Sequence, residues 1–448
     1  MQLHTRHVLN RAFTGLGYVA TGVMAAALLV LLLPIFIKGA GAFVFRGTVE
    51  FRRFEFEQNG RGNRDALQRE LALVSTARAP VYAMLDAAEQ EIAAAPPARQ
   101  RELKSALAGL REDIRVLLGP APGQPVPVLL RGQYGQTRWD RARVKLHDVL
   151  FSETWDYSDP SGMGRKVYVP RSEEFEGLSI TSLFPYLEAH VADMLRPRVT
   201  VYWRFLTDDS RDAHIFGGIM PELLGTFYLT LGAILIAVPL GVLTAVYLTE
   251  YAREGMAVRF LRSCMSTLAG VPSIVFGLFG LAFFINTLQV SRSKSVLAGS
   301  LTLALLILPT VIRAAEEAIR AVPQAYREAA LALGAGTWRT VYSVVLPAAL
   351  PGILTGIVIS MGRAAGETAP IIFTAAVSVG VPLKLWEVFS HPTPALSWNI
   401  YNLCTEHEAV DEIRHVQYGM VFVLVGLVLL LNLSAILLRA RIAKKLKA

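Results

Sequence analysis

Long apolar runs divide this chain of 448 residues into alternating hydrophobic and polar stretches. A helix needs about 20 consecutive, mostly apolar residues to cross the hydrocarbon of a bilayer. The pattern therefore predicts an all-α polytopic membrane protein with six transmembrane helices, over 16–37, 219–249, 264–288, 296–315, 351–378 and 416–438. The first run is long for a secretory signal peptide and is followed by a weak cleavage site, so we interpret it as a retained anchor.

A polar stretch of mixed composition, residues 39–217, separates the first two runs and predicts an inserted soluble domain. We expect it to be α+β. Two helices over 64–118 should break at Pro96-Pro97, and 173–195 should contain another helix. Alternating or β-rich segments predict strands at 48–57, 125–132 and 165–170.

Basic residues cluster beside the apolar runs, and their placement predicts the topology. The formal net charge is +8. Under the positive-inside rule both termini and the loop 316–350 lie in the cytoplasm, and 39–217 lies outside. The expected parts are therefore 1–38, with the cytoplasmic N-terminus and first helix; 39–217, the periplasmic α+β insertion; and 218–448, a five-helix core. This placement argues against nucleic acid as the reason for the charge.

Candidate chemistry outside the membrane is sparse. Cys264 and Cys404 fall on opposite predicted faces and should not form a disulfide. His147, His190 and His214 are isolated, which favours ordinary surface or core roles, and no metal-ligand spacing stands out. The chain has no GxxxxGK[ST] phosphate loop, so we predict a non-catalytic subunit with no cofactor.

The loop 316–350 has the signals of a helix–turn–helix. Pro323 suits the first turn of a helix, and Gly334 falls where a left-handed C-terminal cap is expected. Thr337 is placed to cap a second helix over 338–346. Pro347 and Pro351 then mark the turn into the next membrane helix. The alternative is an ordinary amphipathic loop.

Two charged residues interrupt the fifth apolar run. Arg363 lies 11 residues after Gly352, about 16 Å of helix rise and near mid-bilayer, and Glu367 follows one turn later. Glycines at 352, 356, 362 and 366 provide small faces for close helix contact. With Thr368 beside the pair and Arg313 on the fourth run, these residues predict a substrate pathway at Arg363, Glu367, Thr368 and Arg313. Alternatively, Arg363 and Glu367 only neutralise each other, and Arg313, like Glu316 and Glu317, marks an interface.

The order of residues in 328–347 resembles the EAA loop of ABC importer permeases. It gives Glu328, Ala329 and Ala330, then Gly334, and then Val344, Leu346 and Pro347. With the RAAGETAP segment at 363–370 and the six-helix plan, 219–445 resembles the PstA family of phosphate importer permeases. The resemblance implies ATPase coupling through Glu328, Ala329, Gly334, Leu346 and Pro347, and passage of phosphate past Arg363. The insertion departs from the compact family plan.

The same resemblance implies partners and a location. It implies a homologous permease PstC, two copies of the ATPase PstB and the periplasmic phosphate-binding protein PstS, in the bacterial inner membrane. A permease for another oxyanion, such as sulfate or molybdate, stays open. An ion-coupled secondary transporter would use Arg363 and Glu367 but leaves the EAA loop unexplained. A third alternative is a membrane-anchored sensor whose exported domain binds a ligand. The several predicted membrane helices and the absence of a predicted cytoplasmic output domain argue against it.

Overall fold

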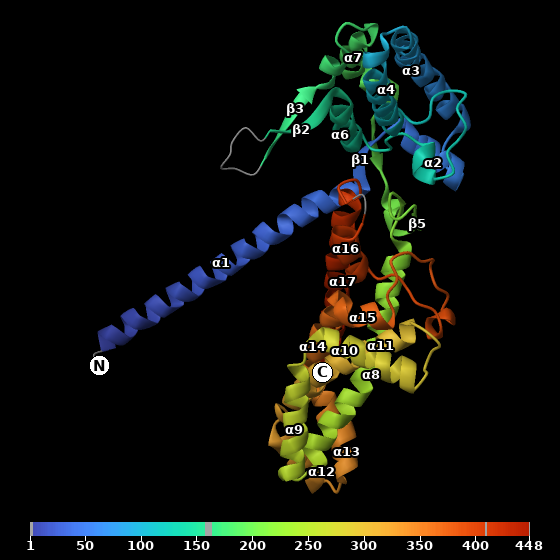
Figure 1. The fold of residues 1–448 in the computed structure, drawn as a ribbon. Helices are drawn as coiled ribbons and strands as arrows, with labels where there is room; N and C mark the ends of the chain where they lie inside the picture. The colour runs from blue at the N-terminus through green and yellow to red at the C-terminus, as the bar shows by residue number, and fades with distance from the viewer. Residues whose placement is uncertain (1–2, 157–163, 408–409, 448) are drawn as a thin grey trace. The chain divides into compact units, whose positions relative to one another are not determined.

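The computed structural model describes residues 3–156, 164–407 and 410–447 (Figure 1). The chain separates into two compact units, one of residues 43–202 and one of residues 1–42 with 203–448. The predicted insertion, 39–217, extends beyond the first unit at both ends. We describe each unit by itself, and call the second the helical unit.

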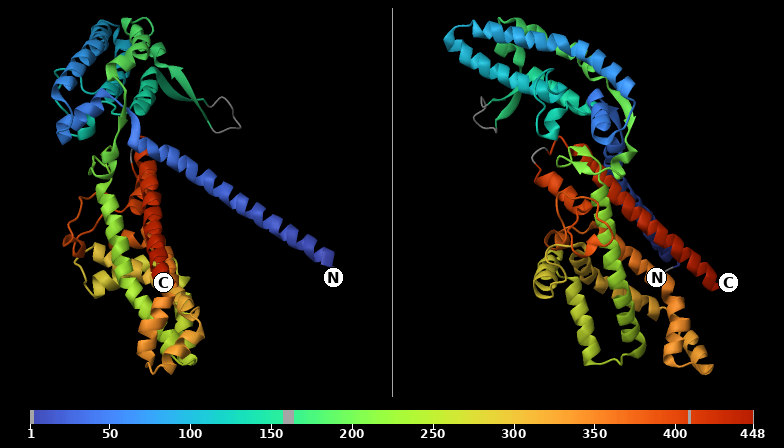
Figure 2. Two further views of the ribbon diagram at one scale, coloured as in Figure 1. Left: turned by 180° about the vertical axis from the view of Figure 1, so that it is seen from behind. Right: turned by 90° about the vertical axis from the view of Figure 1, so that its right-hand side faces the viewer.

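The helical unit is built around apolar helices. Four of the stretches long and apolar enough to cross a membrane fall on α1 (Leu3–Phe43), α8 (Met220–Val246), α11 (Val296–Arg320) and α17 (Arg414–Lys447), which can be followed in Figure 2. A fifth runs from Thr337 to Gly366 and contains α13 (Thr337–Thr340) and α14 (Leu346–Gly366). A further pair, 256–269 and 273–287, passes the same test together but is bent by 101°.

Shorter elements join these helices. Three π-helical turns are η4 (Tyr247–Tyr251), η5 (Leu281–Thr287) and η6 (Val341–Val345). The bent pair comprises α9 (Met256–Ala269) and α10 (Ser273–Gly280), which continues into η5. The others are η3 (Trp203–Leu206), β5 (Ser210–Arg211), β6 (Phe216–Gly217), α12 (Gln324–Ala332), α15 (Ala369–Thr374), η7 (Glu387–Phe389) and α16 (Leu396–Thr405).

Two predicted spans differ from the structure. The run 264–288 is not one straight helix, because Gly270 and Pro272 separate α9 from α10. The run 351–378 is not one helix either. Its helix starts earlier and ends at Gly366, where Glu367 takes an extended conformation (φ −73°, ψ 132°) before α15 begins. Pro370 lies in the first turn of α15, where its missing N–H costs nothing.

Small residues let α8, α11 and α14 approach closely. A Cβ atom added to Gly352 would lie 2.7 Å from the Cβ of Ala318, and one added to Gly356 would overlap with the Cβ of Ala314. The predicted close contact is thus confirmed at these two glycines. It is wrong for Gly366, which has no neighbour within 4 Å of that position. The pairing also shows that α11 and α14 run antiparallel.

In the unit 43–202, the strands at the two ends of the segment pair with each other. β1 (Val44–Gly47) pairs antiparallel with β4 (Arg198–Val201), and Val44 faces Val201. A second antiparallel pair is formed by β2 (Phe151–Asp156) and β3 (Arg165–Pro170). The helices are α2 (Val49–Asn59), α3 (Arg64–Ala93), α4 (Pro97–Leu118), α5 (Leu130–Gln133), α6 (Trp139–Leu150) and α7 (Leu183–Leu195), with 3-10 turns η1 (Arg171–Phe175) and η2 (Ser179–Ser182). Its main core lies between α3, α4, α6 and α7.

The sequence predicted this unit only in part. The helix break at Pro96-Pro97 and the strand 165–170 are confirmed. The predicted strand 48–57 is wrong: it is the helix α2, which buries Glu50 against Arg78 at 3.0 Å and ends at Gly60 in a left-handed conformation. The predicted strand 125–132 is also wrong. Pro125 and Pro127 lack the N–H that a strand needs, and a single helical turn follows.

We expect Gly356→Ala to destabilise the helical unit by about 1–3 kcal/mol, because the new methyl group has no space against Ala314. Thermal denaturation in detergent and the amount of protein in the membrane measure the effect. Gly362→Ala is the matched control on the same helix, since its nearest neighbour is an ordinary 3.5 Å from the added atom. Equal stability of the two variants would contradict the packing argument.

Candidate coupling hairpin and buried charge sites

Residues 323–345 form a helical hairpin at the end of α11. Pro323 precedes α12, and Gly334 ends it with φ +80°, so the predicted left-handed position is confirmed. The N–H of Ala335 donates to the carbonyl of Ala330 at 3.1 Å, which closes the turn. An L-residue pays a steric cost in this conformation, so glycine suits the position.

The second arm of the hairpin differs from the prediction. Gly336, not Thr337, precedes the helix, and no side chain caps it. The helix then continues without a turn through Pro347 and Pro351 as far as Gly366. The π turn η6 lies just before Pro347, and a wider turn of this kind accommodates a residue that lacks the backbone donor. The arm is therefore continuous with a membrane helix.

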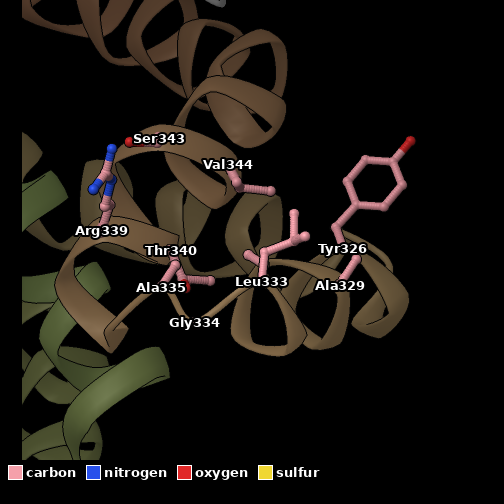
Figure 3. Close-up of a pocket in the computed structure, with 10 residues that line it drawn as sticks. Tyr326, Ala329, Leu333, Gly334, Ala335, Arg339, Thr340, Ser343 and Val344 are labelled. Atoms are coloured by element: carbon pink, nitrogen blue, oxygen red, sulfur yellow. The ribbon is translucent and has the colours of Figure 1, made fainter.

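An apolar groove of about 570 Å³ lies between the two arms (Figure 3). Leu333 projects beside it and is 89% exposed, and Val344 faces it from the second arm. The lining residues are Tyr326, Ala329, Ala330, Leu333, Gly334, Ala335, Arg339, Thr340, Ser343 and Val344. Of the residues predicted for ATPase coupling, Ala329 and Gly334 therefore line the groove. Glu328 is exposed on α12, whereas Leu346 and Pro347 begin α14.

A partly buried ion pair attaches the hairpin to the membrane helices, with the Arg327 and Glu250 side chains 15% and 11% exposed. Arg327 donates from Nη2 to Glu250 Oε1 at 2.8 Å and from Nε to the same carboxylate at 3.2 Å. The guanidinium also donates to the carbonyls of Val322 at 2.7 Å and Ile319 at 2.9 Å. These contacts join α12 to η4 at the end of α8 and to the end of α11. We call this arrangement the Arg327 clamp.

Sequence analysis missed the clamp. Arg327 lies in the loop 316–350, where the basic residues predict only a cytoplasmic location. The available signal was Glu250, a carboxylate placed directly after a long apolar run. Nearby, Glu254 accepts from Arg262 at 2.8 Å, and this hydrogen bond lowers the pKa of the Glu254 carboxyl.

Arg363 and Glu367 lie at the end of α14 and not in the middle of a helix. Arg363 is in its last turn, and Glu367 is the first residue beyond it. The Nε of Arg363 donates to Glu367 Oε1 at 3.2 Å, and the two side chains are 42% and 19% exposed. The expectation that both charges sit on one helix is therefore wrong, whereas a position near mid-bilayer stays a prediction. Thr368 follows as the N-cap residue of α15.

Arg313 lies on a different helix from this pair. It is exposed on α11, with no hydrogen bond or ion pair to any of the described residues. Because Ala314 faces Gly356 in the antiparallel pairing, Arg313 is level with residue 357, about 9 Å along the axis from Arg363. Glu316, one turn from Arg313, approaches Arg262 at 3.7 Å, in keeping with an interface.

Comparison with known proteins identifies the class. Residues 237–448 match the family described as "Binding-protein-dependent transport system inner membrane component". The chain is 36% identical over 255 residues to the probable ABC transporter permease protein YqgI of Bacillus subtilis, covering 55% of this chain and 86% of the relative. These matches identify a non-catalytic, multi-pass permease subunit of an ABC importer in the inner membrane.

Other relatives define the group within this class. The chain is 40% identical over 223 residues to phosphate transport system permease protein PstA 1 of Mycobacterium tuberculosis, covering 50% of this chain and 71% of the relative. It is 36% identical over 232 residues to PstA of Yersinia pestis, covering 51% and 74%. The chain belongs to the PstA family of permeases. A solved inward-facing MetNI methionine ABC transporter covers 50% of this chain and 94% of its own, at 20% identity and a TM-score of 0.39.

We expect Arg327→Met to release the hairpin while the membrane helices stay folded. Removing the guanidinium leaves the largely shielded Glu250 carboxylate without its cation. A fully buried pair would lose about 3–5 kcal/mol, and we expect a smaller cost here because the two side chains are 15% and 11% exposed. Hydrogen exchange of amides 322–340 should accelerate accordingly. The double change Arg327→Met with Glu250→Met should recover part of the protection, because no lone charge remains buried.

Arg320→Met is the matched control, since Arg320 is an exposed arginine at the end of α11, close to the hairpin in sequence. If Arg327→Met and Arg320→Met show the same exchange in 322–340, the clamp does not hold the hairpin.

Proposed function

We propose that this chain forms half of the transmembrane pathway of a phosphate importer, with the anion meeting Arg363. The observation that carries the proposal is the set of hydrogen bonds made by the Arg363 guanidinium. Its Nε donates to Glu367, whereas its two Nη atoms have no acceptor among the described residues. Four N–H donors in a planar fork are thus available to the oxygens of an oxyanion. The names of the phosphate transport relatives agree with this substrate class.

Glu367 provides a physical basis for choosing phosphate over sulfate. Near neutral pH phosphate carries at least one P–OH hydrogen, which a carboxylate can accept. Sulfate has no hydrogen to donate, so it would meet only repulsion from Glu367. A site that pairs Arg363 with an acceptor therefore favours a protonated oxyanion. A ligand without a hydrogen would leave the Glu367 acceptor unpaired, and an unpaired acceptor withdrawn from water costs free energy. Thr368 adds a hydroxyl next to the pair, and Arg313 extends the basic route along α11.

The hairpin supports docking of a separate ATPase at the other end of the helical unit. Under the positive-inside rule, the basic residues near it support a cytoplasmic location for this end and for both termini, and a periplasmic location for the unit 43–202. The groove offers exposed Leu333, and Glu328 is exposed on α12, the first arm of the hairpin. The second arm continues into α14, the helix that ends at Arg363. Movement of the hairpin on closure of the ATPase dimer is thereby transmitted along one helix to the proposed anion site.

The complete importer would contain PstC as the second permease, PstB as the ATPase that hydrolyses ATP, and PstS as the phosphate-binding protein. In this scheme the chain binds no cofactor and contributes no catalytic residue. The ATPase selects between two arrangements of the permease by its different contacts with the hairpin in each.

Gly334→Leu should uncouple the permease from its ATPase. The left-handed backbone disfavours any L-residue by roughly 1–2 kcal/mol, and the side chain would enter the groove. We expect normal membrane levels with reduced co-purification of the ATPase and reduced phosphate uptake. Gly336→Leu is the matched control, because its φ of −73° accepts any residue and no atom lies within 4 Å of the added Cβ. Full co-purification with Gly334→Leu would refute the docking assignment.

Arg363→Gln should reduce phosphate uptake while the complex assembles and hydrolyses ATP. A charge-assisted hydrogen bond contributes about 1.5–3 kcal/mol, so the loss should be roughly ten- to a hundredfold. Arg363→Lys should restore only part of the rate, since an ammonium lacks the planar fork. The measurement is the initial rate of labelled phosphate uptake.

The alternative, mutual neutralisation of Arg363 and Glu367, predicts a different double mutant. If neutralisation were the only role, Arg363→Gln with Glu367→Gln would transport phosphate at the wild-type rate. We expect this double variant to remain as slow as Arg363→Gln alone.

A further inference from the structure

A second group of buried polar residues lies at the end of α8 opposite the hairpin. His214, Glu222 and Asn399 are 3%, 0% and 1% exposed. His214 Nε2 lies 2.8 Å from Glu222 Oε1, and Asn399 Nδ2 lies 3.0 Å from the same oxygen. They come from the loop before α8, from the first turn of α8 and from α16. We call them the outer cluster.

Hydrogen counting fixes one proton of the outer cluster. The two hydrogens on Asn399 Nδ2 are used by Glu222 Oε1 and by the carbonyl of Ser378 at 3.1 Å. The 3.3 Å approach of Asn399 Nδ2 to His214 Nε2 therefore has no hydrogen left to share. His214 Nε2 must then carry its own hydrogen and donate it to Glu222. Glu222 Oε1 accepts both bonds, so it is not the protonated oxygen.

One further proton is needed to balance the charge. Glu222 Oε2 and Asn399 Oδ1 are buried and have no hydrogen-bond partner among the described residues. With a neutral imidazole, the cluster would hold an unbalanced carboxylate away from solvent, which is strongly unfavourable. A proton on His214 Nδ1 or on Glu222 Oε2 makes the cluster neutral. The two positions describe one shared proton on a coupled pair.

The backbone is bent to bring His214 into this position. Asp212, Ala213 and His214 take φ angles of 49°, 52° and 71°, three successive left-handed residues without a glycine. Such conformations persist only where surrounding contacts outweigh their cost. A ring nitrogen of His407 donates to the carbonyl of Ala213 at 2.8 Å and supports the bend. The outer cluster thus holds a strained loop against two helices.

The outer cluster is linked to the proposed anion site through α16. Two residues before Asn399, Ser397 donates to the carbonyl of Glu367 at 3.0 Å. The start of the same helix is tied to α8, because the N–H of Leu396 donates to the buried hydroxyl of Thr226 at 2.8 Å. Displacement of α16 would therefore move the backbone of Glu367, whose carboxylate holds Arg363.

We propose that the outer cluster binds one proton and, in that state, holds α16 where it positions Glu367 and Arg363 for the anion. The proposal rests on the function proposed above, and it makes His214, Glu222 and Asn399 positioning residues. Loss of the proton leaves a buried charge, loosens the loop and α16, and lowers transport as pH rises. The other charged or titratable groups on the segments around the cluster include Asp208, Asp209, Arg211, Asp212, Tyr228, Lys294, Glu367, Lys384, Glu387, His391, Tyr401, Cys404, Glu406 and His407.

The test compares phosphate uptake by the complete transporter across a pH series from about 6 to about 8.5, where imidazole groups commonly titrate. Glu222→Gln keeps an acceptor for His214 and Asn399 but removes the charge, so it imitates the protonated cluster. We expect it to retain a severalfold larger fraction of its uptake at the alkaline end than the wild type. His214→Ala should be slow at every pH while still co-purifying with its partner subunits.

Glu406→Gln is the matched control, an exposed carboxylate at the end of the same helix. It should follow the wild-type pH profile, which also removes the effect of phosphate ionisation from the comparison. If Glu222→Gln shares that profile, or His214→Ala transports like the wild type, the proposal is overturned. Wild-type protein that carries no phosphate at any pH would instead overturn the proposed function.

A measurement on the unmodified transporter covers the case in which Glu222→Gln fails to accumulate. Hydrogen exchange of amides 210–217 and 396–405, corrected for the intrinsic effect of pH, should show extra opening at the alkaline end. Unchanged protection across the series would also overturn the proposal.

Discussion

Pairing of a shielded carboxylate near each end of α8 is the constraint on which the helical unit depends, because the side chains of Glu222 and Glu250 are 0% and 11% exposed. Glu222 and Glu250 are 28 residues apart, about 40 Å of helix rise, which exceeds the roughly 30 Å hydrocarbon of a bilayer. Neither charge can be withdrawn from water without a compensating donor. His214 and Asn399 donate hydrogen bonds to Glu222, and Arg327 forms an ion pair with Glu250. Asn399 and Arg327 come from segments 177 and 77 residues away from their carboxylates in the sequence, so these pairings also fix the fold.

These two pairings act on different parts of the proposed mechanism. The Arg327 clamp makes α12 part of the same body as the ends of α8 and α11, so force on the hairpin is not lost in a flexible loop. The outer cluster holds α16 in position, and Ser397 of α16 donates a hydrogen bond to the backbone carbonyl of Glu367. Between them, α14 carries the second arm of the hairpin at one end and Arg363 at the other. A continuous helix is a direct physical connection between the hairpin and Arg363.

The sequence predicted the elements that depend on local rules. Apolar length located the membrane helices, and Pro323 with Gly334 located the first arm of the hairpin. Errors arose where the backbone departs from regular helix, as at Glu367, or where a buried ion pair decides the structure, as for α2 with Glu50 and Arg78. The outer cluster was beyond such reasoning. His214 is isolated in sequence, and its partners lie 8 and 185 residues away.

The position of Arg363 at the C-terminal end of α14 bears on how an anion could be released as well as bound. The last carbonyls of a helix carry partial negative charge, which stabilises a cation there by roughly 0.3–1 kcal/mol and opposes an anion nearby. Glu367 adds a full negative charge to one side of the guanidinium. Both effects reduce the field that a bound phosphate would experience. A transport pathway requires binding strong enough to admit the substrate and weak enough to let it leave. An arginine partly compensated by its own helix end and by one carboxylate satisfies both conditions, whereas an uncompensated arginine in a dry site would retain the anion.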